Sequence, residues 1–382
     1  MDAAGVLLAA LVSTSLLVWL RGLRGLLRSL AALEEWPQCS RRGRTVSAVI
    51  AVRDEERRLP ALLDRLLEAG DDRLVEVIVV DDGSRDSTPL LVEEYAARDP
   101  RVRLIRSPGP PPGWAPKAYA LRLGASAASG EVLLFLDADT RPASGESLVA
   151  AAAELAQPGG LVAFVPRFLC RGRLCRAVES YMTGVAHGFY GFHRVRDPRD
   201  GLAWMYGCCW AVLRGDYERL GGHEAVRGSL VEDRDFAAYA KSRGYAVVPV
   251  DARREVGVES YEDLRGYAML VARLAADKAR SSPATAWAGY VAGVAAVHLA
   301  PLAVLAYSAA AGNAVLAALS GAALGAQLLL HAAGARVNLD NPAYGLGGHL
   351  GHAASLWGLL LARRGYRWRG RSYGGGSRTS AA

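Results

Sequence analysis

Two short apolar runs that each end in a pair of acids constrain this chain more than any other feature. They are residues 77–82, which end in Asp81-Asp82, and residues 132–139, which end in Asp137-Ala-Asp139. Runs of this length, rich in Val, Leu and Ile, are typical of strands buried on both faces of a parallel sheet. Carboxylates just beyond the carboxyl ends of such strands lie where open α/β sheets bind ligands.

The Asp-x-Asp pattern indicates a metal site. Asp137 and Asp139 place two hard oxygen ligands close together, which suits Mg²⁺ or Mn²⁺ carrying a diphosphate. We therefore expect an enzyme that handles a nucleotide-diphosphate compound, with Asp137 and Asp139 as the ligands of a divalent metal.

The segment between residues 46 and 250 alternates between strand and helix patterns. Strands are expected at 46–52, 75–80, 102–106 and 131–136, and helices at 57–69, 88–97 and 117–128. This alternation predicts a doubly wound, mostly parallel α/β sheet. Beyond residue 160 the signals are mixed, with strands expected at 161–166, 208–213 and 245–250 and helices at 174–192 and 235–242.

The two ends of the chain are apolar enough to cross a bilayer. Residues 3–20 carry no charge, and residues 287–311 and 314–333 are separated only by Gly312-Asn313. These lengths predict an N-terminal transmembrane helix and a C-terminal transmembrane hairpin. A signal peptide is the alternative at the N-terminus, but no basic segment precedes the apolar stretch.

The expected organisation has seven parts. They are a transmembrane helix (1–21), a basic linker (22–44), a catalytic domain (45–252), an interfacial helix region (253–283), the transmembrane hairpin (284–334), an interfacial or re-entrant segment with a basic end (335–373), and a disordered tail (374–382). Arginines after the first helix place the catalytic domain in the cytoplasm by the positive-inside rule. We expect a multi-pass protein of the cell membrane.

Charge and cysteine content narrow the partners. The net charge of +7, from 45 basic and 38 acidic residues, is concentrated beside the apolar segments. That placement favours an anionic membrane surface and argues against nucleic acid as a partner. The five cysteines form no Cys-x-x-Cys pair, so we expect packing thiols in a reducing compartment.

The tip of the first expected strand carries Arg53, Asp54 and Glu55. A turn rich in carboxylates can hold a base or ribose by hydrogen bonds, although acids are also common in the first turn of a helix. Because Asp81 and Asp82 end the neighbouring strand, the sequence favours a nucleoside site.

Two further positions carry charge at expected helix starts. Lys117 follows a loop rich in Pro and Gly, where a lysine can contact phosphate. Glu232 and Asp233 precede a short amphipathic helix, and sugar transfer to a hydroxyl needs a general base. The alternatives are a solvated lysine and an acidic helix cap.

This order of motifs resembles that of family 2 glycosyltransferases with a GT-A fold, over residues 45–250. Asp-Asp-Gly-Ser, then Asp-x-Asp, then Glu-Asp at a late helix start is more specific together than any one motif. Gly113-Trp-Ala-Pro-Lys117, followed by Ala120, is similar to a segment of the membrane-bound hopanoid-associated and carotenoid glycosyltransferase branch. The terminal Trp368-Arg-Gly-Arg-Ser-Tyr373 also matches that branch.

The resemblance implies roles for these residues. The nucleotide-sugar would be bound by Arg53, Asp54, Glu55, Asp81, Asp82, Lys117 and Asp137. The metal would be held by Asp139 with Asp137. Asp233 would be the catalytic base, with Glu232 supporting it. Pro116 stands where the branch usually has glycine.

The expected function is a membrane-bound inverting glycosyltransferase that moves a sugar from a UDP- or GDP-sugar to the hydroxyl of a membrane lipid. One alternative is a polyprenyl-phosphate sugar transferase, whose ionised acceptor needs no strong base. A second alternative is an inactive membrane protein that binds a partner on a transferase scaffold.

Overall fold

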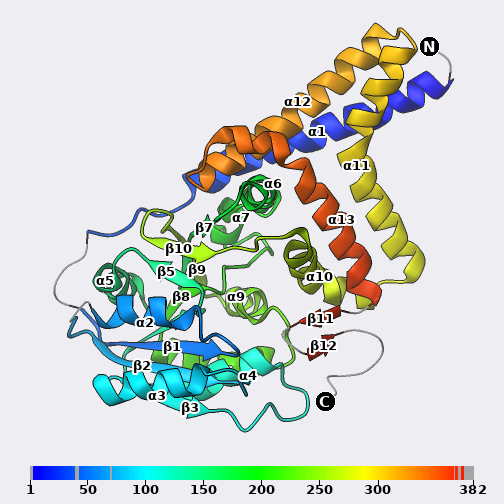
Figure 1. Ribbon diagram of the computed structural model, residues 1–382. Coiled ribbons are helices and arrows are strands. Elements are labelled where there is room, and N and C mark those ends of the chain that lie inside the picture. Colours follow the sequence, from blue (N-terminus) through cyan, green and yellow to red (C-terminus); the bar gives the residue numbers. More distant parts are fainter. Residues whose placement is uncertain (1–2, 39–42, 69–70, 365, 369–370, 374–382) are drawn as a thin grey trace. The chain divides into compact units, whose positions relative to one another are not determined.

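The computed structural model describes residues 3–38, 43–68, 71–364, 366–368 and 371–373 (Figure 1). The predicted disordered tail, Cys39 and part of the terminal Trp368–Tyr373 motif lie outside these residues. The chain divides into two compact units. The sheet unit comprises Ala32–Leu169 and Phe192–Glu259, and the helical unit comprises Met1–Ala31, Cys170–Gly191 and Ser260–Ala382.

A seven-stranded sheet forms the centre of the sheet unit, in the order β3-β2-β1-β4-β8-β6-β9. The strands are β1 (Val46–Val52), β2 (Leu74–Asp81), β3 (Val102–Arg106), β4 (Val132–Leu136), β6 (Gly160–Val165), β8 (Cys209–Leu213) and β9 (Ala246–Asp251). Strand β8 runs antiparallel to both β4 and β6, and the other neighbours pair in parallel. The predicted mixed, mostly parallel sheet is confirmed.

Helices cover both faces of this sheet. On one face α2 (Leu59–Leu67), α3 (Thr88–Arg98) and α5 (Gly145–Leu155) pack on inward-facing residues of β1 and β2. On the other face α4 (Pro116–Ser126) and α9 (Glu232–Ser242) pack on β1, β4 and β8. Helix α5 was not predicted, because its run of alanines gives little amphipathic periodicity.

A second, three-stranded sheet was also not predicted. It has the order β5-β10-β7, from β5 (Thr140–Pro142), β10 (Val256–Glu259) and β7 (Arg167–Leu169). Strands of three or four residues are too short to show an alternating pattern. Strand β10 lies in the region predicted as interfacial helix, so the sheet unit extends to Glu259.

Three short elements complete the sheet unit. They are α7 (Phe192–Arg196), α8 (Arg214–Arg219) and the 3-10 helix η1 (Gly222–Val226). Helix η1 packs against α4 and α9, the two helices whose first turns carry predicted site residues.

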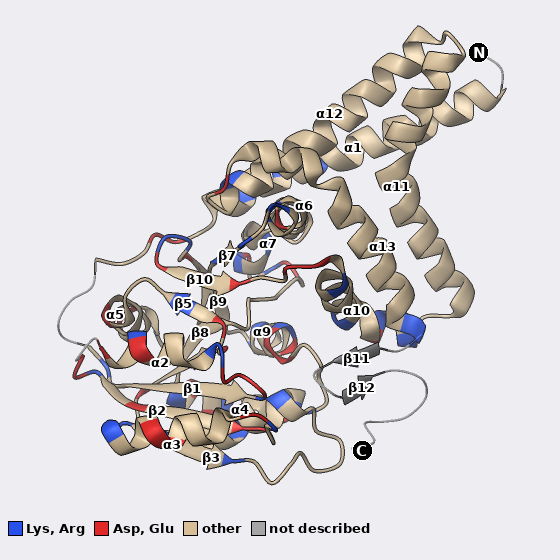
Figure 2. Ribbon diagram, in the orientation of Figure 1, with Lys and Arg blue, Asp and Glu red and all other residues tan. Residues whose placement is uncertain are grey.

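The helical unit contains α1 (Ala3–Ala31), α6 (Arg173–Phe189), α10 (Leu264–Ser281), α11 (Ala284–Ala310), α12 (Ala314–Val337), η2 (Pro342–Gly347), α13 (His349–Arg364) and the hairpin of β11 (Tyr366–Trp368) and β12 (Arg371–Tyr373). Among the described residues, α1, α11 and α12 are long and apolar enough to cross a membrane. Figure 2 shows how sparse charged residues are along α11 and α12. Helix α6, predicted within the catalytic domain, belongs to this unit.

Helix α1 is longer than the sequence pattern predicts. It runs through the segment assigned to the basic linker and ends at Ala31. Arginine is a good helix former, and buried Leu26 continues the packed side of the helix. Gly25 also lies on this side, where a Cβ atom would collide with the carbonyl oxygen of Gly188 in α6. Close packing through small residues is typical of helices in membranes.

The cysteine prediction is wrong for two residues. Cys170 and Cys175 form a disulfide at the start of α6, whereas Cys208 and Cys209 are buried free thiols, as expected. Sequence gave no signal for this bridge, because a spacing of five residues fits no common pattern. Disulfides are typical of oxidising compartments, which argues against the reducing environment expected for these two cysteines. The cytoplasmic placement of the catalytic domain stays a prediction.

Candidate active site

The predicted site residues gather at the carboxyl edge of the parallel strands. Strand β1 pairs with β2 on one side and with β4 on the other. The order of the strands therefore reverses at the junction of β1 and β4, which is where open α/β sheets bind ligands. The tips of β1, β2 and β4 carry Arg53–Glu55, Asp81–Asp82 and Asp137–Asp139.

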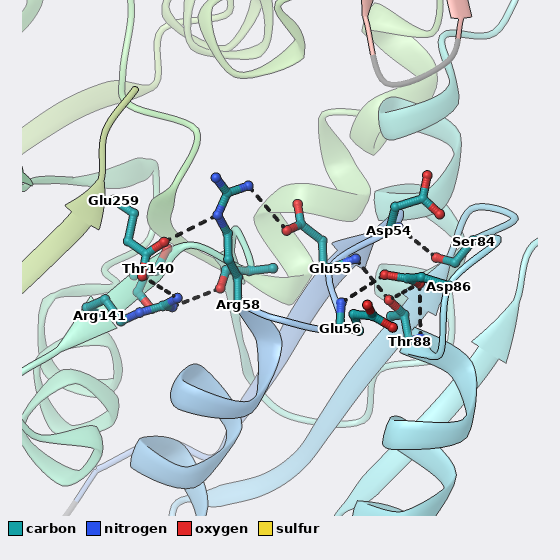
Figure 3. A network of polar contacts seen from close by, with 11 residues as sticks. Asp54, Glu55, Glu56, Arg58, Ser84, Asp86, Thr88, Thr140, Arg141 and Glu259 are labelled. Atoms are coloured by element: carbon teal, nitrogen blue, oxygen red, sulfur yellow. Dashed lines mark hydrogen bonds and ion pairs between the residues drawn. The ribbon is translucent and has the colours of Figure 1, made fainter. Parts of the chain in front are cut away.

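The tips of β1 and β2 are joined by bonds between backbone and side chains (Figure 3). The backbone N–H of Asp54 donates to Ser84 Oγ at 2.9 Å, and the N–H of Arg85 donates to Asp54 Oδ1 at 2.7 Å. Asp54 has a positive φ of 54°, which aspartate tolerates better than most residues. Arg53 Nη1 donates to the carbonyl of Asp82 at 2.8 Å. These bonds fix the shape of the predicted nucleoside site.

The Asp-x-Asp turn is held against the start of β8. The backbone N–H of Asp137 and the hydroxyl of Thr140 both donate to the carbonyl oxygen of Cys208, at 3.1 and 2.7 Å. Thr140 N–H also donates to the Asp137 carbonyl at 3.0 Å. The turn is therefore tied to the neighbouring antiparallel strand.

Lys117 connects this turn to the Glu-Asp motif. Its Nζ lies 2.8 Å from Asp137 Oδ1 and 2.9 Å from Glu232 Oε1. Burial alone lowers the pKa of Lys117, but the charges of Asp137, Glu232 and Asp233 outweigh it, so the pKa lies well above its ordinary value. The lysine is therefore a permanent cation that brings together acids almost a hundred residues apart in sequence.

The first turn of α9 presents its two acids differently. Glu232 is buried and paired with Lys117, whereas Asp233 is partly exposed. Gly207 lies directly beside Asp233, and a Cβ atom at Gly207 would come within 2.4 Å of Asp233 Oδ2. Because Gly207 has no side chain, there is room beside it for the Asp233 carboxylate.

An aromatic layer underlies these charges. Phe135 lies two residues before Asp137 on β4, and Phe236 lies one turn after Glu232 on α9. The buried His223 ring stacks on Phe236 and meets Phe135 edge to face. Burial and the charge of Lys117 lower the pKa of His223 to about 3, so the ring is neutral. This layer fixes the strand and the helix that carry the charged side chains.

Three site residues were missed by the sequence analysis. Arg58 at the start of α2, Arg141 in β5 and Glu259 in β10 form an ion-pair network beside the Asp-x-Asp turn (Figure 3). Glu259 accepts from Arg141 at 2.9 Å and from Arg58 at 3.3 Å. Isolated charged residues, two of them in strands too short to predict, left no sequence signal for this network.

Comparison with known proteins shows which family the sheet unit resembles. The model of glycosyl transferase family 2 matches residues 47–221. A 4,4′-diaponeurosporenoate glycosyltransferase from Staphylococcus haemolyticus is 35% identical over 192 residues, which are 49% of each chain. A dolichyl-phosphate beta-glucosyltransferase from Mus musculus is 35% identical over 106 residues, covering 25% of this chain and 31% of that protein. The chain thus spans half or less of the length of these curated relatives.

The fold has a counterpart among solved structures. A mannosyltransferase from Pyrobaculum calidifontis, in complex with GDP-Man and Mn²⁺, aligns with a TM-score of 0.57. It is 23% identical, and the alignment covers 93% of this chain and 98% of that one. This likeness confirms the predicted GT-A fold. Residues 47–221, a little under half of the chain, are similar to glycosyl transferase family 2.

Proposed function

We propose that this protein is a membrane-bound inverting glycosyltransferase that moves a sugar from a nucleotide-diphosphate donor to the hydroxyl of a lipid. The observation that carries the proposal is the position of Lys117, whose ammonium group contacts both the Asp-x-Asp turn and the Glu-Asp helix start. A donor-binding motif and a candidate base thus share one site. The match of residues 47–221 to glycosyl transferase family 2 supports the reaction class.

The donor would lie along the strand tips. Arg53, Asp54 and Glu55 of β1 would face the nucleoside, together with Asp81 and Asp82 of β2. Buried or hydrogen-bonded carboxylates can accept from the N–H and O–H groups of a base and ribose. Lys117 would then exchange a carboxylate for a phosphate oxygen of a UDP- or GDP-sugar.

The residues present fit a divalent metal carried with the diphosphate. No group of three His, Cys, Asp or Glu side chains forms a ready metal site within the described parts of the chain. Mg²⁺ is commonly held by one or two carboxylates together with substrate phosphates, and Asp137 and Asp139 provide that number. Bound Mg²⁺ or Mn²⁺ would neutralise charge on the leaving diphosphate.

Asp233 would act as the base. It removes the proton of the acceptor hydroxyl as the oxygen attacks the anomeric carbon. The bond from that carbon to the diphosphate breaks on the opposite face, so the nucleoside diphosphate leaves and the configuration inverts. Glu232 would hold the Lys117 ammonium group in place, so that its positive charge stays near Asp233. General bases of this kind contribute roughly 10²- to 10⁴-fold to rate.

The proposed acceptor is a membrane lipid. Three helices of the described chain are long and apolar enough to span a bilayer, which would hold the protein in contact with lipid. The names of both curated relatives above refer to lipid-like acceptors, a carotenoid acid and a dolichyl phosphate. We propose the cell membrane as location, with the catalytic domain in the cytoplasm.

A polyprenyl-phosphate sugar transferase is the second candidate. The similarity to dolichyl-phosphate glucosyltransferases favours it. A phosphate acceptor is already ionised, so an Asp233→Asn variant would keep turnover with a polyprenyl phosphate and lose it with a hydroxylated lipid. Measuring both acceptors with wild type and variant separates the two candidates.

The reaction itself is tested with purified protein in detergent, a total lipid extract, and a panel of UDP- and GDP-sugars. We expect a glycolipid product that requires Mg²⁺ or Mn²⁺ and is lost in Asp139→Ala. Folded protein that releases no nucleotide from any donor would instead support a binding protein on a transferase scaffold.

A further inference from the structure

Two arginines share Glu259 but are held very differently. Arg141 is 16% exposed and donates to Glu259 Oε1 at 2.9 Å and to the carbonyls of Ala138 and Thr140 at 2.9 and 2.8 Å. These three short bonds make it a brace for the Asp-x-Asp turn. Arg58 is 45% exposed, and its contacts are 3.3 Å to Glu259 Oε2 and 3.6 Å to Glu55 Oε2. Its guanidinium group is therefore held loosely.

The Arg58 side chain lies within the predicted donor site. Figure 3 shows its guanidinium group between Glu259 on one side and Glu55 on the other. Burial lowers the pKa of Arg58, but the charges of Glu55, Asp139 and Glu259 outweigh it and raise the pKa. Arg58 is thus surrounded by acids from the β1 tip, the Asp-x-Asp turn and β10.

The two acids of the Asp-x-Asp motif each have a cation nearby. Lys117 contacts Asp137, and Arg58 pairs with Glu259, whose backbone N–H donates to the carbonyl oxygen of Asp139 at 3.1 Å. A nucleoside bound at the β1 and β2 tips would direct its diphosphate into this turn. A planar guanidinium group matches two phosphate oxygens at once, which an ammonium group does not.

We propose that Arg58 binds the diphosphate of the donor on the Asp139 side of the site. Donor binding replaces its long contacts to Glu55 and Glu259 with short bonds to phosphate oxygens, while Arg141 keeps Glu259 and the turn in place. The inference rests on the proposed function, because it names a further binding residue for the same donor.

A purely structural role for Arg58 makes a different prediction. If its main task were to attach α2 to β10 through Glu259, its loss would lower stability and weaken all ligands alike. A diphosphate contact instead affects only ligands that carry the diphosphate. Nucleosides and nucleoside diphosphates therefore distinguish the two roles.

The test uses the full chain in detergent with Mg²⁺ and with Mn²⁺. Calorimetry measures the affinity for UDP and GDP, saturation-transfer NMR follows uridine and guanosine, and thermal unfolding gives Tm. The variants are Arg58→Met, Arg58→Lys and the matched control Arg65→Met, which lies on the exposed side of the same helix and pairs with Glu68 at 3.7 Å.

We expect Arg58→Met to weaken diphosphate binding about tenfold or more, as for loss of a charged hydrogen bond. Nucleoside binding and Tm of Arg58→Met should stay near the wild-type values. The diphosphate affinity of Arg58→Lys should fall between those of the wild type and Arg58→Met. Arg65→Met should behave as wild type. Equal diphosphate affinity in wild type and Arg58→Met would overturn the inference, as would a parallel loss of Tm and nucleoside binding. Failure of the wild type to bind either diphosphate would overturn the proposed function itself.

Discussion

The two ends of the candidate site are built by different kinds of contact. At the β1 and β2 tips, backbone N–H groups donate to side-chain oxygens, as from Glu55 N to Thr88 Oγ1 at 2.9 Å and from Glu56 N to Asp86 Oδ2 at 3.1 Å. At the other end, Lys117 joins Asp137 to Glu232 through side chains alone.

The strand-tip end thus determines the shape of the candidate site, and the lysine end determines its charge. The strand-tip end is a frame of hydrogen bonds between backbone N–H groups and side chains, so loss of one of these side chains should cost stability. The lysine end is a balance of one cation against several acids, so changes there should cost turnover while the fold survives. Substitutions at the two ends of the site test this division.

The largest effect is expected for the base. Asp233→Asn keeps the size of the side chain and removes its ability to accept a proton. Turnover with a hydroxylated lipid should fall about 10³-fold, within the range for general bases. Product formation is measured against donor binding and Tm, both of which should remain unchanged. Retained turnover with that acceptor would exclude Asp233 as the base.

The position of the base is tested at Gly207. Gly207→Ala adds a Cβ atom that would lie 2.4 Å from Asp233 Oδ2, so the carboxylate must move. Displacement of about 1 Å at a reacting group costs roughly 10²-fold in rate. Gly201→Ala is the matched control, because its Cβ atom would meet no heavy atom within 4 Å. Equal turnover in the two variants would contradict the proposed placement.

The charge balance is tested at Lys117. Lys117→Met leaves Asp137 and Glu232 facing each other without their shared cation, and it removes a phosphate partner. We expect donor affinity to fall about tenfold, the size of one charged hydrogen bond. Lys241→Met serves as comparison, because Lys241 donates to three backbone carbonyls away from the site and should affect Tm. If Lys117 had only a structural role, Lys117→Met would change Tm without lowering donor affinity, as Lys241→Met should.

The rigid frame is tested at Asp86. Burial raises the pKa of this carboxyl, but hydrogen bonds from Thr88 and from the Glu56 backbone outweigh it and lower the pKa below 3.8. Asp86→Ala leaves these donors unpaired and should cost about 1–3 kcal/mol of stability. Because the folded-state pKa is the lower one, this stability is present above pH 3.8 and is lost as pH falls through the folded-state value.

Thermal unfolding across pH checks this prediction. The Tm difference between wild type and Asp86→Ala should be constant near neutral pH and shrink in acid, while turnover of the folded variant stays close to wild type. If Asp86→Ala had a normal Tm but lost turnover, Asp86 would not belong to a structural frame, and the division between the two ends would be wrong.

Much of the sheet could be predicted from sequence, because buried parallel strands are continuous apolar runs. The bounds of β1 and β3 match the expected ranges, and the acids chosen from the motifs lie together at one edge of the sheet. Their roles in binding and catalysis remain predictions. The acids of β1, β2 and β4 were visible from local sequence, because each pair comes at or just after the end of its own strand.

The rest depends on contacts between distant residues. Arg58 and Glu259 are 201 residues apart, and the small sheet that brings them together consists of strands with no readable period. The disulfide and the full length of α1 also depend on packing within the helical unit, such as the close approach at Gly25. Sequence patterns report local structure, and these features are tertiary.

The most direct test of the central claim is sugar transfer by wild type and Asp233→Asn, assayed side by side with a nucleotide-sugar panel, a divalent metal and a lipid extract. We expect the wild type to form a glycolipid with inverted anomeric configuration, and the variant to lose about 10³-fold in rate despite normal donor binding. Folded wild-type protein that transfers sugar from no donor, or that retains the anomeric configuration, would contradict this claim.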